Sequence, residues 1–235
     1  MIATGSKKTR LPTGVEQALD GALDKALAIQ RPVVLAYLER IRERNPDADP
    51  ARIIGKLERH YLTAVVGLGG ASGAAAAVPG AGTGVAIASG AAEIAAFVSA
   101  TAMYVLTVAE VHGVPVSDPE VRRALVLAVL LGEAAAALDT GILEAPHWAQ
   151  VLGRSASRDK VAGINSRLAQ LLVTRFGARQ GALLIGRAIP LGIGAGIGAV
   201  GNAALARTAI DAARKAFGPA PKKFAGRVVD MRKSR

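Results

Sequence analysis

A long charge-free stretch sets the strongest limit on how this chain can fold. No charged side chain occurs from residue 61 to residue 92, and beyond Glu93 the chain is again uncharged up to Ala109. Such a stretch belongs in a protein core, in a close-packed helix bundle or in lipid. Ala, Gly and Val dominate it and aromatic residues are only 3% of the chain, so small side chains must supply most of the packing.

Helical spacing and helix-start signals occur along most of the chain. Asp49-Pro50 and Asp118-Pro119 each place a capping residue before a proline at the first helical position. Pro79-Gly80 interrupts the charge-free stretch and predicts a helical hairpin with arms at 62–78 and 82–110. Almost no segment shows the period-two alternation of a half-buried strand. We therefore expect an all-α fold, a multi-helix bundle with Gly- and Ala-rich close-packed helices.

The charge and composition divide the chain into three expected regions. They are amphipathic N-terminal helices in 1–59, a glycine-rich hydrophobic helical core in 60–218, and a basic flexible tail in 219–235. Within the core, Gly132-Glu133 is expected to lie inside a helix, and 160–187 to form a basic amphipathic helix.

Three glycines, Gly196, Gly198 and Gly201, spell GxGxxG before a helical segment. A dinucleotide-binding loop needs a strand before this motif and a second strand after the helix, and neither is present. Glycines four residues apart instead allow two helix backbones to approach closely. We assign helix packing to Gly69, Gly73, Gly80, Gly84, Gly192, Gly194, Gly196 and Gly198, and expect the two glycine-rich regions to pack together.

Two acidic residues, Glu93 and Glu133, lie inside apolar helical runs and are candidate buried carboxylates. One interpretation is a proton or cation site. The interpretation that we favour is a carboxylate on the wet face of its helix, or one bonded to a neighbouring polar side chain.

Catalytic and cofactor motifs are missing from the sequence. There is no cysteine, and His60, His112 and His147 are scattered. Glu144 and His147 have the ExxH spacing of di-metal bundles, but no second ExxH occurs and Pro146 disfavours a helix there. We expect no enzyme, no catalytic residue, no metal site and no cofactor.

The formal net charge of +11 is concentrated in the C-terminal third of the chain. A basic segment of this kind can face anionic lipid or simply be solvated. No stripe of aromatic residues accompanies it, so we expect no nucleic acid partner. The residues that we assign to a membrane surface are Lys222, Lys223, Arg227, Arg232 and Lys233.

Two apolar runs are long enough to span a bilayer: 82–109, in which Glu93 is the one charged residue, and 188–206, which has no charge. Ala and Gly gain little on insertion, however, and no aromatic belt flanks the runs, so a peripheral protein stays an alternative to a spanning one. The N-terminus has no apolar run typical of a signal peptide. We expect a protein at the cytoplasmic face of the cell membrane or integral to it, with both termini cytoplasmic.

Three stretches resemble the EcsC family of bacterial proteins: GAAAAVPGAGTGVAIASGAAEI, VAEVHGVPVSDPEVRRALVLAVLLG, and the pattern Ile189-Pro190, Gly192, Gly196, Asn202. His112-Gly113 stands where that family would have Tyr-Gly. The resemblance covers about residues 60–217. It implies a hydrophobic, membrane-associated protein beside an ABC transporter, and supplies no catalytic residue.

These patterns together predict a non-enzymatic, membrane-associated helical protein, accessory to a transport or secretion system, that acts through lipid and helix–helix contacts. Its expected partners are an anionic lipid surface and either a membrane protein or a second copy of the chain, with no small-molecule substrate identified. The alternative is a soluble helical module that binds an apolar ligand such as a lipid.

Overall fold

The computed structural model describes residues 21, 28–29, 31–76, 83–186 and 194–224. In this part of the chain there are eight helices and no strand, which confirms the predicted all-α fold. The helices are α2 (Arg31–Glu43), α3 (Pro50–Ala76), α4 (Thr83–His112), α5 (Pro119–Leu131), α6 (Glu133–Ala136), α7 (Trp148–Arg154), α8 (Arg158–Gly186) and α9 (Gly194–Phe217).

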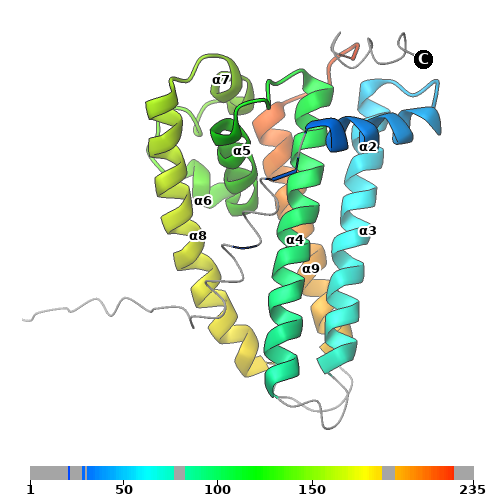
Figure 1. Cartoon of the computed structure of the whole chain (residues 1–235), viewed down its shortest axis with the longest axis vertical. Helices are drawn as coiled ribbons and strands as arrows, with labels where there is room; N and C mark the ends of the chain where they lie inside the picture. The colour runs from blue at the N-terminus through cyan, green and yellow to red at the C-terminus, as the bar shows by residue number, and fades with distance from the viewer. Residues whose placement is uncertain (1–20, 22–27, 30, 77–82, 187–193, 225–235) are drawn as a thin grey trace, which may run out of the picture.

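Three long helices form the centre of the bundle (Figure 1). Helix α3 packs against both α4 and α9, so the two arms of the predicted hairpin lie side by side and the two glycine-rich regions belong to packed helices. Helix α5 lies against α4 and α9 and carries α8 on its other side. Helix α2 packs on α4 near the end of the bundle where α7 also lies.

Both predicted helix starts are confirmed. The carboxylate of Asp49 accepts the backbone N–H of Arg52 at 2.8 Å, directly before Pro50 opens α3. The carboxylate of Asp118 accepts the backbone N–H of Glu120 at 2.8 Å, with Pro119 at the start of α5. Each cap satisfies an amide at a helix N-terminus that has no partner within the helix.

One predicted helix interior is wrong. Gly132 does not lie inside a helix: it adopts φ 58° after α5 ends at Leu131, and the chain turns before α6 begins at Glu133. This left-handed conformation suits glycine because glycine has no Cβ. The expected division into 1–59 and 60–218 stays a prediction, and α3 runs across it as one continuous helix.

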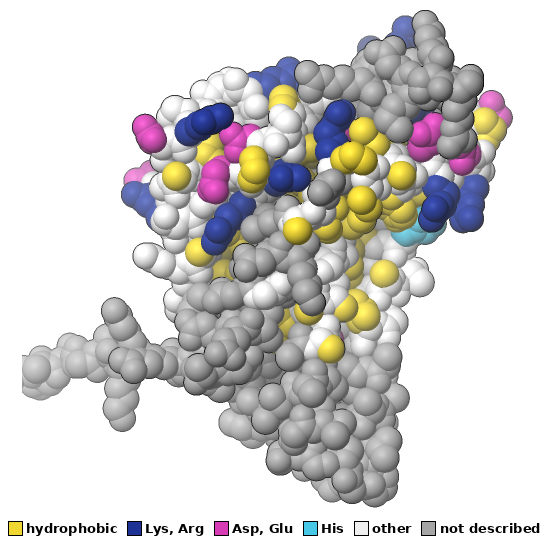
Figure 2. Space-filling model, viewed as in Figure 1, with side chains coloured by type: hydrophobic (Ala, Val, Ile, Leu, Met, Phe, Trp, Pro, Cys, Tyr) yellow, Lys and Arg dark blue, Asp and Glu magenta, His cyan; other side chains and the backbone are white. Residues whose placement is uncertain are grey.

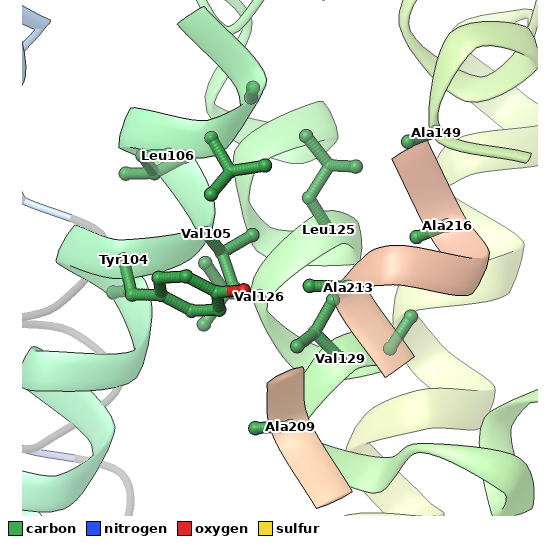
Figure 3. Close-up of a cluster of buried hydrophobic side chains, with 14 of the residues drawn as sticks. Tyr104, Val105, Leu106, Leu125, Val126, Val129, Ala149, Ala209, Ala213 and Ala216 are labelled. Carbon is green, nitrogen blue, oxygen red and sulfur yellow. The ribbon is translucent and has the colours of Figure 1, made fainter. Parts of the chain in front are cut away.

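Small side chains on α9 bring that helix close to its neighbours. Figure 3 shows Ala209, Ala213 and Ala216 facing larger side chains from α5, among them Leu125 and Val129. All of these residues are 2% exposed or less. Alanine leaves room for a close backbone approach, and the larger residues fill the space between the helices. Trp148, the only tryptophan in the chain, is also in the core, at the first position of α7.

Helix α8 joins the bundle through its N-terminal half. The buried hydrophobic residues there lie three or four positions apart and form one stripe that packs on α5. They are Val161, Ile164, Leu168 and Leu172, each 3% exposed or less. The predicted helix at 160–187 is therefore confirmed as α8.

Candidate functional site

The bundle has two ends of opposite character. At one end, α2 packs on α4, α3 begins, and α4 and α9 finish; Figure 2 shows the Lys, Arg, Asp and Glu side chains gathered over this charged end. At the other end lie residues 61–76 of α3, 83–92 of α4 and 194–206 of α9, none of which is charged. We call these three segments the charge-free end. The C-terminal part of α8, which contains Arg175 and Arg179, reaches the same end (Figure 1).

The surface of the charge-free end is uncharged as well. Where the structure describes side chains there, every exposed position is apolar, glycine or a hydroxyl residue. Val200 is 72% exposed, the highest value among the large hydrophobic residues of the described chain. The exposed positions are Thr63, Ala64, Gly67, Ala92, Val200, Gly201 and Ala204. Water-soluble surfaces are usually rich in charge, so this end is unusual.

The glycines assigned to helix packing divide into three groups. Gly69 is buried in α3. Gly73, Gly84, Gly194, Gly196 and Gly198 lie in helices, but their surroundings are outside the described side chains, and Gly80 and Gly192 lie outside the described residues altogether. The GxGxxG motif is part of α9 and forms no loop between a strand and a helix.

Glu93 is half-buried and forms part of a polar link between the three central helices. The Asn202 side chain of α9 donates to Oε1 of Glu93 at 3.0 Å and to the backbone oxygen of Val65 at 3.1 Å. Asn202 is itself only 9% exposed. The carboxylate is therefore bonded to a neighbouring polar side chain, which is the interpretation favoured from the sequence.

The assignment of Glu133 as a buried carboxylate is wrong. Its side chain is 85% exposed and pairs with Lys215 at 2.7 Å, and this hydrogen bond and positive charge lower the pKa of Glu133. The reason is the turn at Gly132, which takes Glu133 off the apolar face of α5 and places it at the surface.

The sequence analysis missed the carboxylate that is buried most deeply, Glu110. Its side chain is 5% exposed and receives two hydrogen bonds from Arg31, from Nε at 2.5 Å and from Nη2 at 2.9 Å. Arg31 opens α2, whereas Glu110 lies in the last turns of α4. The only local signal was an acidic residue after a long apolar run, and nothing in the sequence pointed to a partner 79 residues away.

The predicted basic surface residues do not adjoin the charge-free end. Lys222 and Lys223 are exposed and follow α9, whose last residue is Phe217 at the charged end. Phe224 then lies under the Arg42 guanidinium of α2, 4.2 Å from ring centre to Cζ. Arg227, Arg232 and Lys233 lie outside the described residues. Lys222 and Lys223 are thus separated from the charge-free end by the last part of α9, about 16 Å for the eleven residues from Arg207 to Phe217.

A cavity of about 610 Å³ opens at the charged end between α3, α4 and α9. Glu58 of α3 and Arg214 of α9 form a bidentate pair at its edge, with N–O distances of 2.8 and 2.7 Å. His112 and His147, which are far apart in the sequence, both line it. His60 does not, and lies 3.4 Å from the Tyr37 hydroxyl instead.

His112 is held in an environment that disfavours its charged form. Its Nδ1 donates to the carbonyl oxygen of Val108 at 3.0 Å, and its Nε2 is buried without a partner in the described structure. Burial lowers the pKa of the ring below 6.5, although the nearby backbone of Val108, Gly218 and Pro219 opposes the shift. The ring is therefore neutral at neutral pH.

We expect acidification to destabilise the fold through His112. Because the folded pKa lies below the unfolded value of 6.5, the unfolded chain takes up this proton first, and stability is lost as the pH falls through and below that value. The melting temperature should fall between about pH 7.5 and about pH 5.5. A His112→Asn variant, measured by circular dichroism, should lose part of this dependence; an unchanged slope would contradict the assignment.

One helix of the described chain is long and apolar enough to cross a membrane, the Ala92–His112 segment of α4. Within its most apolar window, 72% of the residues are buried inside the protein, and the core helix of a soluble protein passes the same test. The predicted run at 188–206 lies partly outside the described residues. The described helices are thus compatible with membrane association and with a soluble bundle.

The polar groups at the cavity are suited to hydrogen bonding. Among the described residues, no three His, Asp or Glu side chains gather in a way that could hold a metal ion. Both oxygens of Glu58 already accept hydrogen bonds from Arg214 and keep lone pairs for further donors.

Comparisons with known protein families, with curated proteins and with solved structures each find no match for this chain.

Proposed function

We propose that the protein is a non-enzymatic, membrane-associated helical protein whose charge-free end enters the apolar layer of a lipid bilayer. The observation that carries this proposal is the uncharged exposed surface formed by the described side chains of α3, α4 and α9 at this end, with Val200 72% exposed. Hydrocarbon excludes charged side chains and tolerates small and apolar ones on helices, whose backbone groups are bonded internally.

The polar groups of this region support the same proposal. Glu93 directly follows the charge-free segment of α4, and Asn202 binds it between the helices. The exposed Arg207 directly follows the charge-free segment of α9. A carboxylate bonded in this way costs less near lipid than one that points outward. The charged end would stay in water, and it carries both Arg31 and Phe224, so both described chain ends would lie on one side of the membrane.

The basic residues take a smaller part in this proposal than the sequence analysis expected. Lys222 and Lys223 lie at the charged end, so they do not face the bilayer that the charge-free end would enter. The net charge of +11 would still draw the protein toward anionic lipid over longer distances. The resemblance to the EcsC family and the accessory role beside a transporter stay predictions.

Vesicle co-sedimentation tests the proposal with paired lysine variants. Ala64→Lys/Val200→Lys places two charges on exposed positions of the charge-free end, and a lysine in hydrocarbon costs about 2.5–3.5 kcal/mol. We expect binding to vesicles of phosphatidylcholine and phosphatidylglycerol to fall at least about tenfold. The control, Val33→Lys/Val151→Lys, adds the same charge at exposed valines of α2 and α7 and should keep the binding.

Equal loss in the two variants, or no vesicle binding by the unchanged protein, would refute the proposal. The second result would favour the alternative from the sequence, a soluble helical module with an apolar ligand. The specific observation behind that alternative is the burial of most of the Ala92–His112 segment within the bundle. Detection of lipid in protein purified without detergent would then support it.

A further inference from the structure

The cavity at the charged end has the size and the mixed lining of a small-molecule site. Its volume of about 610 Å³ lies within the range of about 300–1,000 Å³ that organic ligands occupy. Helices α3, α4 and α9 contribute the walls, and the turn after α9 together with His147 closes one side. Such sites have mainly apolar walls and a few polar groups that orient the ligand.

Aromatic rings and aliphatic side chains make up the apolar part of the lining. Phe217 of α9 packs on the His112 ring, with 5.3 Å between ring centres. Val108 of α4 and Ile54 of α3 add aliphatic surface. Flat rings of this kind favour contact with another flat ring at offset or tilted geometry. The shape and chemistry of the wall therefore suit a planar aromatic body.

Two polar groups at the cavity have hydrogen-bonding capacity left over. The Tyr104 hydroxyl makes no hydrogen bond with any described residue, although the ring is only 3% exposed and stacks on Tyr61 at 4.7 Å. Figure 3 shows this hydroxyl directed from α4 toward α9. Tyr104 of α4 and Glu58 of α3 line the same cavity, so both groups can act on one ligand.

Backbone strain occurs at the same cavity. His147 has φ 55° and is the one described residue other than glycine with positive φ. Gly218, with φ 77°, lies against it so closely that an added Cβ would overlap the His147 ring. Strained conformations persist where the surrounding structure holds them, and they cluster at binding sites.

We propose that this cavity binds a neutral aromatic molecule that carries a hydroxyl group. The ring of the ligand packs against Phe217 and Val108. Its hydroxyl donates to the Glu58 carboxylate and accepts from the hydroxyl of Tyr104. Glu58 and Arg214 neutralise each other as an ion pair, so this pair offers no net charge to attract a charged ligand. The site lies at the opposite end of the bundle from the charge-free end, so the inference is independent of membrane association.

Isothermal titration calorimetry with two matched probes tests the hydrogen-bond part of the proposal. The first probe is 2-naphthol, and the second is 2-methoxynaphthalene, which has the same ring system but no donor. We expect 2-naphthol to bind the unchanged protein at least tenfold more tightly, because its hydroxyl can donate to Glu58. Equal affinities, or no heat from 2-naphthol, would overturn the proposal without any variant being required.

A cavity-filling variant tests the location. An added Cβ at Gly55 meets only Arg59 at 3.8 Å, so Gly55→Leu should fit on α3 and place its side chain at the cavity. We expect it to weaken 2-naphthol binding at least tenfold. The control is Gly163→Leu on α8, where an added Cβ meets nothing within 4 Å and the cavity is remote. Equal binding by the two variants would place the ligand elsewhere and overturn the proposal.

Discussion

Replacing Arg31 by Met lowers the free energy of unfolding by about 3 kcal/mol, because it leaves the buried carboxylate of Glu110 without its cation. Glu110 is 5% exposed on its side chain, so water cannot take over the two hydrogen bonds that Arg31 donates. The methionine keeps most of the aliphatic length of Arg31, so packing changes little. Urea unfolding followed by circular dichroism measures the effect.

Two further variants separate loss of the ion pair from loss of packing. Arg31→Met/Glu110→Leu removes both charges and should recover most of the stability, since a buried ion pair replaced by apolar groups is often neutral. Lys215→Met breaks the ion pair with Glu133. Both side chains of this pair are exposed to water, so the melting temperature should stay unchanged. A double variant as unstable as Arg31→Met would refute the electrostatic explanation.

Replacing Leu168 by Ala should also destabilise the fold by about 3 kcal/mol. Leu168 is fully buried in the stripe by which α8 packs on α5. Alanine at this position leaves a cavity between the two helices. Calorimetric unfolding measures the loss. Ser166→Ala, two residues away on the exposed face of α8, is the matched control and should stay within about 0.5 kcal/mol. A loss below about 1 kcal/mol for Leu168→Ala would contradict the packing of α8.

Local signals in the sequence were sufficient for most of the helices. Asp49-Pro50 and Asp118-Pro119 predict helix starts because a cap and its amide partner lie within three residues of each other. Helical periodicity likewise predicts α8. Gly132 was misjudged because a glycine inside a helix costs only about 1 kcal/mol, so the residue alone does not distinguish a tolerated position from a turn.

The candidate sites depended on contacts that no local pattern contains. Arg31 and Glu110 are 79 residues apart, and Glu58 and Arg214 are 156 apart. Their pairing follows only from how α2 and α9 pack on the central hairpin. His112 and His147 were correctly seen as separated in sequence, yet the turn after α9 brings both to one cavity. The charge-free segments, by contrast, could be predicted from the sequence, because the absence of charged residues alone defines them.

The position of Trp148 gives the protein a single built-in optical reporter. Its indole is 7% exposed, so its fluorescence emission should lie at short wavelength in the folded protein and move to longer wavelength when α7 separates from α9. Because the chain has no second tryptophan, the whole signal comes from this one place. The residue before it is His147, at the rim of the cavity, so the same emission would respond to an aromatic guest there and not to events at the charge-free end.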